Sequence, residues 1–410
     1  MSKLEKLLEG IEVEWKDFGD IAKIQRGASP RPIAKFITDD KNGVPWIKIG
    51  DTEPNSKYVK KTKQKITTEG AKKSRLLKRG DLIMSNSMSF GRPYILDING
   101  AIHDGWASIS DFENLLNTDF LYHYLASDIV QYYWLNKINS SSVSNLNADI
   151  IKSLKIPIPC PDNPDKSLKI QKEIVRILDT FTELTTELTT ELTARKKQYE
   201  YYREQLLTFE ESEVEWKTLG EVANVYDSLH KTPKYADNGL SMIRVTDIKG
   251  GYVDLNKTLR VNEEIFSVFT KKYLPKKDDL VMSRVGSYGN VGIIPVDDAA
   301  CMGQNTVIIN PQINFKFLFY ILVSSIGQNF IEKNVSGGNQ KTLSLKSIKT
   351  IPIPIPSLEE QQRIVNILDK FDVLTTSISE GLPKEIELRQ KQYEYYRNKL
   401  LTFPKVTVEV

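Results

Sequence analysis

The sequence predicts an α/β fold of the α+β type, with two globular halves in tandem, separated by a pair of long antiparallel coiled-coil helices, and an internal pseudo-two-fold repeat. The first observation is a repeated segment: RKKQYEYYREQLLTF at 195–209 returns as RQKQYEYYRNKLLTF at 389–403, with twelve identities in fifteen positions. The second is that other segments recur in the same order, such as VEWKDFGDIAKI at 13–24 and VEWKTLGEVANV at 214–225. Two copies of about 200 residues are too few and too long for a solenoid, which indicates a pseudo-dimer within one chain.

Composition sets the class of protein. The chain has 410 residues, of which 40% are hydrophobic and 27% charged, a globular balance with room for two or three domains. The net charge of +3 is not the strongly basic balance of a small nucleic-acid-binding domain, so a polyanion would have to meet local patches. No long apolar run or signal core is present, which predicts a cytoplasmic protein. Cys160 and Cys301 are expected to be reduced thiols.

The globular halves are expected to combine short strands with helices. The apolar runs DLIMS at 81–85, DLVMSRV at 279–285 and NTVIINP at 305–311 predict strands. Aromatic and aliphatic residues at three-to-four spacing predict one helix over 118–135. The IPIP segments cannot be helical, because alternating prolines hold the chain extended. Each extended segment should lead from a globular half into its helix.

Each long helix should carry a heptad seam, because apolar residues alternate in steps of three and four. Ser167 and Ser357 are expected N-caps, and Glu360 completes a capping box with Ser357. Gly381 and Pro383 should kink or break the second helix. The first seam runs through Ile170, Ile174, Ile177, Phe181, Leu184, Leu188, Leu192, Tyr199, Tyr202, Leu206 and Phe209; the second runs through Ile364, Ile367, Phe371, Leu374, Ile378, Tyr393, Tyr396, Leu400 and Phe403.

The first helix contains TELTTELTTELTA at 182–194, with leucine and glutamate each recurring every four residues. One interpretation is an incidental helical repeat. The other is a ruler, since one unit changes the helix by about one turn.

Motifs for catalysis are missing from the sequence. There is no P-loop, no dinucleotide-binding glycine motif, no zinc-protease motif, no nucleophile elbow and no methyltransferase tetrapeptide. The three histidines are far apart in sequence, and His123 on the aromatic helix is expected to be a core or surface residue. The chain is therefore predicted not to be an enzyme.

The stretch from Lys57 to Gly80 holds ten lysines or arginines and one acid, Glu69. It is either a solvated basic face or a surface that contacts phosphates.

The tandem layout, the junction of IPIP with SLEEQQRIVNILDKF and the T-E-L repeats resemble the specificity subunit of Type I restriction-modification systems, of the kind with repeats in the central spacer. The resemblance implies target-recognition domains at 1–159 and 211–356, a central spacer helix at 160–210, and a C-terminal spacer helix and tail at 357–410. It also implies that each domain reads one half of a bipartite, asymmetric target in double-stranded DNA, while the helices set the spacing.

The same resemblance implies partners that carry the cofactors. Two modification subunits would bind S-adenosylmethionine and methylate adenine, and motor-nuclease subunits would use ATP and Mg²⁺; no cofactor or metal is expected on this chain. The repeated KQYEYYR blocks would dock the partners, although the tyrosines could equally pack the coil. The predicted docking residues are Tyr199, Tyr202, Arg203, Tyr393, Tyr396 and Arg397, with both arginines off the seam.

DNA contacts are expected in polar loops beside the repeated strands, where the two halves differ. Arginine, asparagine and glutamine can make bidentate contacts with bases, whereas lysine more often holds phosphate. The candidates are Arg26, Arg31, Lys57, Lys60, Lys61, Lys63, Asn86 and Arg92 in the first half, and His230, Lys231, Arg244, Arg284, Tyr288, Asn339, Gln340 and Lys341 in the second.

Two other functions stay open at this point. The chain could be a protein-interaction scaffold whose helices carry two modules that never touch DNA, or an enzyme acting on nucleic acid with an unrecognised site. The missing motifs weigh against the enzyme, and the basic stretch weighs against the scaffold.

Overall fold

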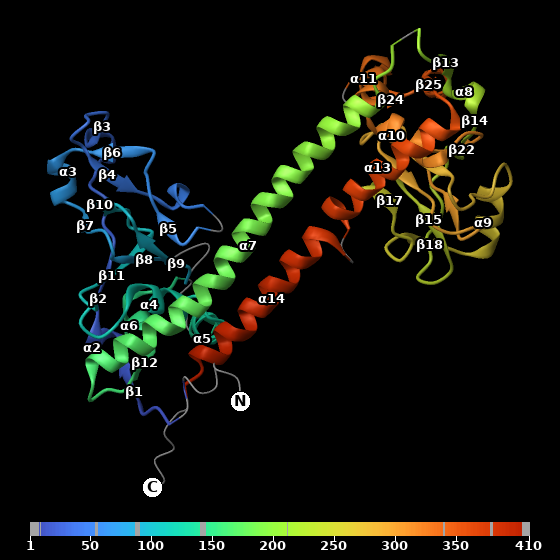
Figure 1. Ribbon diagram of the computed structural model, residues 1–410. Helices are drawn as coiled ribbons and strands as arrows, with labels where there is room; N and C mark the ends of the chain where they lie inside the picture. The colour runs from blue at the N-terminus through green and yellow to red at the C-terminus, as the bar shows by residue number, and fades with distance from the viewer. Residues whose placement is uncertain are drawn as a thin grey trace. The chain divides into compact units, whose positions relative to one another are not determined.

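A computed structural model describes residue 8 and residues 10–53, 56–86, 91–139, 145–210, 212–338, 341–377 and 380–403 (Figure 1). The chain divides into two compact units. Unit 1 comprises residues 1–187 with 387–410, and unit 2 comprises residues 188–386. Each unit therefore holds one globular domain together with parts of two long helical segments.

Domain 1, in unit 1, is built on two five-stranded sheets. The first has the strand order β2-β11-β8-β9-β5 and the second β3-β6-β4-β10-β7. The strands are β2 (Lys23–Arg26), β3 (Ile37–Thr38), β4 (Val44–Ile47), β5 (Tyr58–Val59), β6 (Gln64–Ile66), β7 (Arg75–Leu77), β8 (Leu82–Ser85), β9 (Pro93–Leu96), β10 (Gly100–Ile102) and β11 (Trp106–Ser110); the helices are α2 (Phe18–Ile21), α3 (Thr68–Lys72), α4 (Thr118–Leu125), α5 (Asp128–Asn139) and α6 (Ala148–Lys152).

Domain 2, in unit 2, repeats this plan. Its larger sheet has the order β14-β22-β19-β20-β17-β16, and a smaller one has the order β18-β15-β21. The strands are β14 (Ala223–Asp227), β15 (Leu240–Ile243), β16 (Ile248–Lys249), β17 (Gly251–Val253), β18 (Leu259–Val261), β19 (Leu280–Ser283), β20 (Val291–Ile293), β21 (Ala300–Met302), β22 (Thr306–Pro311), β23 (Val335–Ser336) and β24 (Thr342–Leu343); the helices are α8 (Leu219–Val222), α9 (Glu263–Thr270), α10 (Phe315–Val323), α11 (Ser325–Asn334) and α12 (Leu345–Lys349). The first five strands of the larger sheet correspond one to one with the first sheet of domain 1, which confirms the internal repeat.

The IPIP segments are strands, as predicted, and they pair with the start of their own domain. β12 (Lys155–Pro159) pairs antiparallel with β1 (Val13–Asp17), and β25 (Pro352–Ile355) pairs antiparallel with β13 (Glu215–Thr218). Proline lacks an N–H, so such two-stranded ribbons place it where the ladder does not need that donor. Each domain thus begins and ends side by side.

The helical segments confirm the predicted break. α7 (Pro164–Leu207) is one helix of 44 residues, whereas its counterpart is divided into α13 (Leu358–Thr376) and α14 (Gly381–Leu401). Gly381 has φ +78°, and a Cβ added there would lie 2.4 Å from the carbonyl oxygen of Val373. Glycine tolerates this conformation and proximity, and Pro383 suits the first turn of the new helix.

Three local predictions need correction. Ser167 is no N-cap, because α7 starts earlier, at Pro164, and its hydroxyl instead accepts a hydrogen bond from Gln171. Ser357 is an N-cap whose oxygen accepts from the Glu360 N–H, but the carboxylate of Glu360 bonds to Arg363 rather than closing a capping box. The single helix expected over 118–135 is two helices, α4 and α5, separated at Ala126 and Ser127.

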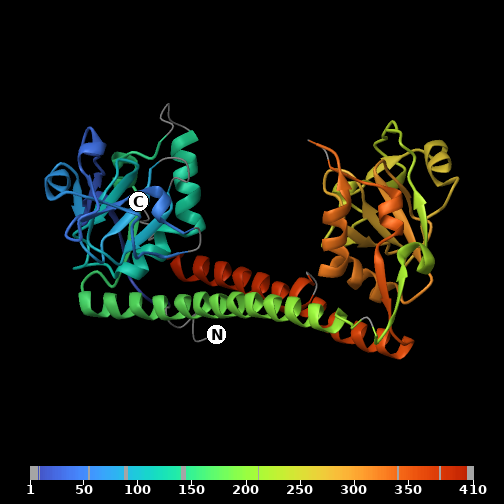
Figure 2. The same ribbon diagram turned by 90° about the horizontal axis from the view of Figure 1, so that it is seen from above.

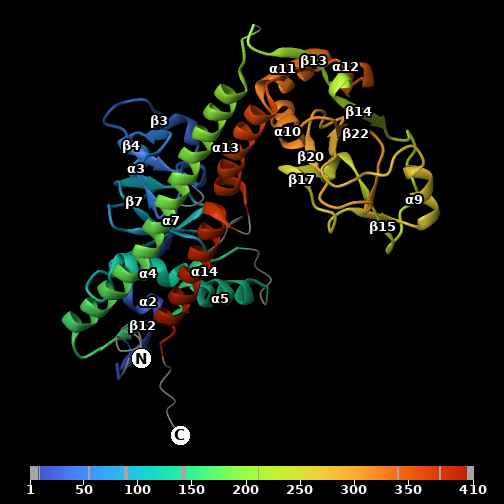
Figure 3. The same ribbon diagram turned by 45° about the vertical axis from the view of Figure 1, so that its right-hand side comes forward.

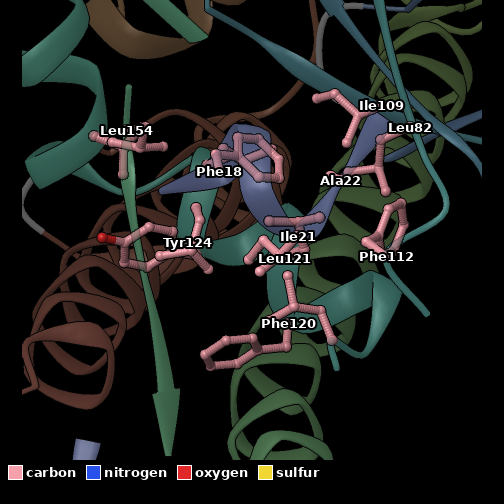
Figure 4. Packing of buried hydrophobic residues seen from close by; sticks show 14 of the residues in the cluster. Phe18, Ile21, Ala22, Leu82, Ile109, Phe112, Phe120, Leu121, Tyr124 and Leu154 are labelled. Carbon is pink, nitrogen blue, oxygen red and sulfur yellow. The ribbon is translucent and has the colours of Figure 1, made fainter. Parts of the chain in front are cut away.

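The core of each domain continues into the helices. In unit 1, Phe18, Leu82, Ile109, Phe120 and their neighbours form a cluster whose packing is shown in Figure 4. The same cluster includes Ile170, Ile174 and Leu178 of α7 and Leu400, Leu401 and Phe403 at the end of α14. In unit 2, the corresponding cluster includes Leu207 of α7 and Ile364, Val365 and Leu368 of α13.

Within each unit the two helical segments run antiparallel, as predicted. In unit 1, Phe181 of α7 stacks on Tyr396 of α14, while earlier α7 residues meet later α14 residues. The first part of α7, in green, and the last part of α14, in red, lie side by side in Figure 1, Figure 2 and Figure 3. In unit 2, Tyr199 and Tyr202 of α7 contact Phe371 of α13. Aromatic residues of the repeated blocks therefore fill part of both seams.

Candidate DNA interface and helical docking surfaces

In domain 1, polar side chains gather where β2 and β8 end and β11 begins. The carbonyl oxygen of Asp104, just before β11, accepts hydrogen bonds from Arg26 Nε and Asn86 Nδ2, both at 3.1 Å. The Asp104 carboxylate accepts from Ser29 Oγ at 2.9 Å and lies 3.0 Å from His103 Nε2. We call these five residues the domain 1 strand-end cluster. It brings together two residues predicted to contact DNA, Arg26 and Asn86.

In domain 2, the same edge of the sheet carries a different set of side chains. Arg284, after β19, forms an ion pair with Asp227 at the end of β14 and donates from Nε to the carbonyl oxygen of Leu343 at 3.0 Å. His230 Nε2 lies 3.3 Å from Asp227. Gln304, before β22, accepts a hydrogen bond from Thr232 Oγ1 at 3.0 Å. These residues, without Leu343, form the domain 2 strand-end cluster, which includes the predicted Arg284 and His230.

The two clusters share one backbone frame. The N–H of Asn86 donates to the carbonyl of Gly105 at 3.1 Å, and the N–H of Arg284 donates to the carbonyl of Asn305 at 2.8 Å. The strand registers make Arg26 equivalent to Asp227, because their partners Ala107 and Val307 occupy the same place in β11 and β22. Domain 1 therefore has its arginine at the end of β2, whereas domain 2 has its arginine directly after β19. This edge of the sheet presents different donors and acceptors in each domain.

The basic stretch divides into exposed and internal residues. Lys60, Lys61 and Lys63 are exposed, as is Arg31. Lys57 has only 13% of its side chain exposed, and its Nζ lies 2.6 Å from Asp119 and 3.0 Å from Asp179. Its ammonium group is thus occupied by two carboxylates within unit 1, which gives it a structural role.

The remaining predicted DNA contacts lie in varied surroundings. Arg92 lies over the ring of Tyr94, at 5.2 Å, and Arg244 is held by Asp247 at 2.8 Å. Tyr288 donates to Glu332 at 2.8 Å, and the ammonium group of Lys341 lies 5.8 Å from the centre of the Tyr288 ring. Lys231 is exposed. Asn339 and Gln340 lie outside the described residues.

The predicted docking residues are mostly turned into the fold. Tyr199, Tyr393 and Tyr396 are half-buried in the seams, and Tyr202 is 39% exposed while stacked on Phe371. Arg203 pairs with Glu204 at 2.9 Å. Arg397 lies off the predicted seam, but it is buried and pairs with Asp128 at 2.7 Å. The cause is α5, whose first residue reaches this face of α14.

The exposed members of the repeated blocks are ones that the sequence analysis did not select. Tyr201 and Tyr395 are each 59% exposed, and they occupy equivalent positions. Beside Tyr201, α7 carries a groove of about 980 Å³ lined by Lys197, Glu200, Tyr201, Tyr202, Glu204, Gln205, Leu206 and Thr208. The helical period could have separated these tyrosines from those of the seam, since Tyr201 is one step of about 100° from Tyr202.

A second missed feature is an aspartate that joins each domain to its helix. Asp179 of α7 accepts a hydrogen bond from the buried His123 at 2.8 Å and forms its ion pair with Lys57. Asp369 of α13, in the matching ILD motif, accepts from Tyr320 at 2.7 Å and pairs with Lys316. The repeat of ILD in the sequence was the available signal for this anchor.

The surroundings of His123 fix its tautomer. An ionised Asp179 can only accept, so His123 Nε2 carries the proton and its Nδ1 accepts from the Tyr393 hydroxyl at 3.0 Å. Burial lowers the pKa of His123, and the hydrogen bond to Asp179 opposes this only in part. Burial acts to raise the pKa of Asp179, but His123 and Lys57 lower it below its usual value. The anchor is therefore a neutral imidazole between a carboxylate and a phenol.

No group of three or more histidine, cysteine, aspartate or glutamate side chains among the described residues could hold a metal ion. None of the helices described is long and apolar enough to cross a membrane.

Comparison with known proteins gives one consistent result. A family model described as "Type I restriction modification DNA specificity domain" matches residues 11–196 and again 211–388. The chain is 37% identical to the "Type I restriction enzyme EcoR124I/EcoR124II specificity subunit" of Escherichia coli, over 99% of this chain and 98% of that one. It is 32% identical to a putative type I restriction enzyme specificity subunit of Haemophilus influenzae, over 98% of both chains.

Solved structures agree on the fold. A chain from a structure concerning "complex assembly and conformational transition of the type I R-M system" superposes with a TM-score of 0.67 at 15% identity, over 95% of this chain and 97% of that one. The HsdS subunit of Thermoanaerobacter tengcongensis gives 0.52 at 16% identity, over 95% and 96%. Both copies of the internal repeat match the family model, and the relatives match from end to end. The chain therefore belongs to the family of Type I restriction-modification specificity subunits.

Proposed function

We propose that this chain selects the DNA target of a Type I restriction-modification complex, with each domain reading one half of a bipartite, asymmetric site. The observation that carries this proposal is the pair of strand-end clusters, in which one backbone frame presents two different sets of polar side chains. A shared frame with different donors and acceptors is what reading two different base sequences through one fold requires. The exposed Lys60, Lys61 and Lys63 of domain 1 would hold phosphates.

Catalysis belongs to other subunits in this proposal. Two modification subunits would bring S-adenosylmethionine, and motor-nuclease subunits would bring ATP and Mg²⁺. A restriction complex acts on DNA in the cytoplasm, which is where the chain would work.

The repeated helical faces are the proposed docking sites for the two modification subunits. The exposed Tyr201 and Tyr395, rather than the buried Arg397, would contact them, because aromatic side chains supply large contact area at low entropic cost. Tyr201→Ala with Tyr395→Ala should weaken assembly measured by analytical ultracentrifugation. Leu388, which is 52% exposed on α14 outside the repeated block, offers a matched control in Leu388→Ala.

The test of sequence reading uses one variant in each cluster. Arg26 and Gln304 are both exposed, so their removal should leave the folds intact. In complex with the modification subunits, Arg26→Ala should relax or change one half of the methylated site, and Gln304→Ala should do so for the other half only. Losing a good bidentate base contact costs about 1–3 kcal/mol of discrimination. If both variants methylate an unaltered site, or if either one changes both halves, the strand-end clusters do not read the bases.

A further inference from the structure

The repeated block creates a problem of recognition within the molecule. Segments 195–209 and 389–403 differ at only three positions: Lys196 and Gln390, Glu204 and Asn398, and Gln205 and Lys399. Domain 1 packs on the second of these segments, and domain 2 packs on the first. Because the two surfaces are nearly the same, something must make each domain prefer its own segment.

One of the three differing pairs contacts a helix of each domain. Gln205 donates to Tyr201, and Lys399 lies over the ring of Tyr395. Lys196 and Gln390 are exposed. Glu204 and Asn398, in contrast, each contact the first residue of a domain helix, α11 and α5 respectively.

In unit 1, the contact consists of one carboxylate and two donors. Asp128, the first residue of α5, accepts from Arg397 at 2.7 Å and from Asn398 Nδ2 at 2.8 Å. Each carboxylate oxygen therefore has its own donor. Figure 3 shows α5 beside the end of α14.

In unit 2, the carboxylate is on the other side of the contact. Ser325, the first residue of α11, occupies the place of Asp128, and its backbone N–H donates to Glu204 at 3.1 Å. Arg203 pairs with the same carboxylate at 2.9 Å. Burial acts to raise the pKa of Glu204, but the hydrogen bonds from Ser325 and Arg203 lower it, which keeps the group ionised. A negative group at the start of a helix is also favoured by its N–H groups.

We propose that Asn398 and Glu204 determine which repeated segment each recognition domain accepts. On its own segment, Asp128 meets two donors. On the other segment it would meet Glu204, so that two carboxylates would compete for one arginine. In the reverse exchange, domain 2 would form no ion pair with Arg397, because neither Ser325 nor Asn398 carries a carboxylate. Specificity of this kind needs a contact that rejects the wrong partner as well as one that rewards the right one.

The charges also differ between the two units at a second contact, where an aspartate of the long helix pairs with a lysine of the domain. Asp179 forms an ion pair with Lys57, which directly precedes β5 and also pairs with Asp119. Asp369 forms its ion pair with Lys316 of α10. Lys316 holds the position in α10 that Asp119 holds in α4. At this equivalent helix position, domain 1 therefore has an acidic residue and domain 2 a basic one, although both domains are attached to their helix by an aspartate–lysine ion pair.

The experiment converts one segment into the other within the full chain. Asn398→Glu should increase hydrogen exchange in residues 128–138 of α5 about tenfold or more, because it places a second carboxylate against Asp128. Asp128→Ser with Asn398→Glu recreates the arrangement of unit 2 and should restore exchange to within about threefold of the unchanged chain. The control, Gln390→Lys, changes an exposed differing position of the same segment and should leave α5 unaffected.

Each outcome decides the proposal. Normal exchange in Asn398→Glu, or an equal increase in the control, overturns it. A double variant that is no better than Asn398→Glu alone also overturns it, because the residues would then not act as a pair. The test reads the attachment of α5 and uses no DNA or partner subunit, so its failure is separate from a failure of the proposed function.

Discussion

At the scale of single residues, His123 is a buried titratable group that links domain 1 to α7. Its ring lies between Asp179 and Tyr393, with Lys57, Asp119 and Tyr122 nearby. Because its pKa in the folded state lies below the usual value of about 6.5, protonation favours the unfolded form. The contribution of His123 to stability is therefore complete above about pH 6.5 and is lost as the pH falls towards the folded-state pKa.

We predict that α4 exchanges its amide hydrogens more readily at about pH 5.5 than at about pH 7.5, after correction for intrinsic exchange rates. His123→Gln should abolish most of that difference, since an amide can donate to Asp179 and accept from Tyr393 without titrating. The slope cannot exceed about 1.4 kcal/mol per pH unit for one group. An equally steep dependence in the glutamine variant would assign the effect to other groups.

The partners of buried polar residues such as His123 could not be predicted from the sequence. His123 was expected in the core or on the surface, but its link to Asp179 joins positions 56 residues apart in the chain. The heptad pattern of its own helix leaves Arg397 off the seam, and the acid that pairs with it, Asp128, comes from α5. Such pairings depend on tertiary packing, which a single helical pattern does not report.

At the scale of elements, we predict that the T-E-L-T units of α7 set the spacing between the two half-sites of the target. One four-residue unit adds about 6 Å of helix and about 40° of net rotation. A base pair advances about 3.4 Å and rotates about 34–36°. The rotations nearly agree, and a recognition domain that is out of phase faces the wrong side of the duplex, whereas DNA bending can absorb some axial mismatch.

Deleting Thr186 to Thr189 should accordingly shorten the non-specific spacer of the target by one base pair and leave both half-sites unchanged. Mapping of methylated adenines in DNA from cells that express the variant with its partner measures both quantities. An unchanged spacer, or new half-site bases, would show that the repeat is not a ruler.

The elements most securely predicted were those whose pattern is local. The apolar runs 81–85 and 305–311 form strands, and Gly381 breaks the second helix, because a continuous apolar run and a glycine are signals within a short stretch of sequence. The division between α4 and α5 was missed, since Ala126 and Ser127 interrupt no apolar pattern. The side chains of the strand-end clusters were only partly predicted: Arg26, Asn86, His230 and Arg284 were selected as polar loop residues. Asp104 and Gln304 were missed, because β-sheet register brings each of them to the cluster of its own domain.

At the scale of the whole molecule, the absence of recognisable catalytic motifs in the sequence leads to a direct expectation. The purified chain should bind no stoichiometric S-adenosylmethionine, as measured by calorimetry, and should hydrolyse no ATP. Adding the modification subunits should introduce S-adenosylmethionine binding. Saturable binding by the chain alone would mean that it contains a cofactor site of its own.

The internal repeat predicts that target symmetry can be imposed by design. Replacing residues 214–356 with a second copy of the first half should give a symmetric methylated site, because both domains would then carry the same strand-end cluster. The grafted copy brings Asp128 to the segment that carries Glu204, so we expect the graft to need Glu204→Asn for full activity. A site that stays asymmetric would show that the two domains do not divide the reading of the target.

The pairing of β1 with β12, and of β13 with β25, has a consequence for how such proteins change over generations. A block whose entrance and exit are neighbouring strands can be removed and replaced without altering the distance that the rest of the chain must span. The same short ribbon, with VEWK on one strand and IPIP on the other, frames both blocks. A gene encoding this protein could therefore acquire a new target preference in one exchange of a continuous segment, while the helices and their partners stay as they were.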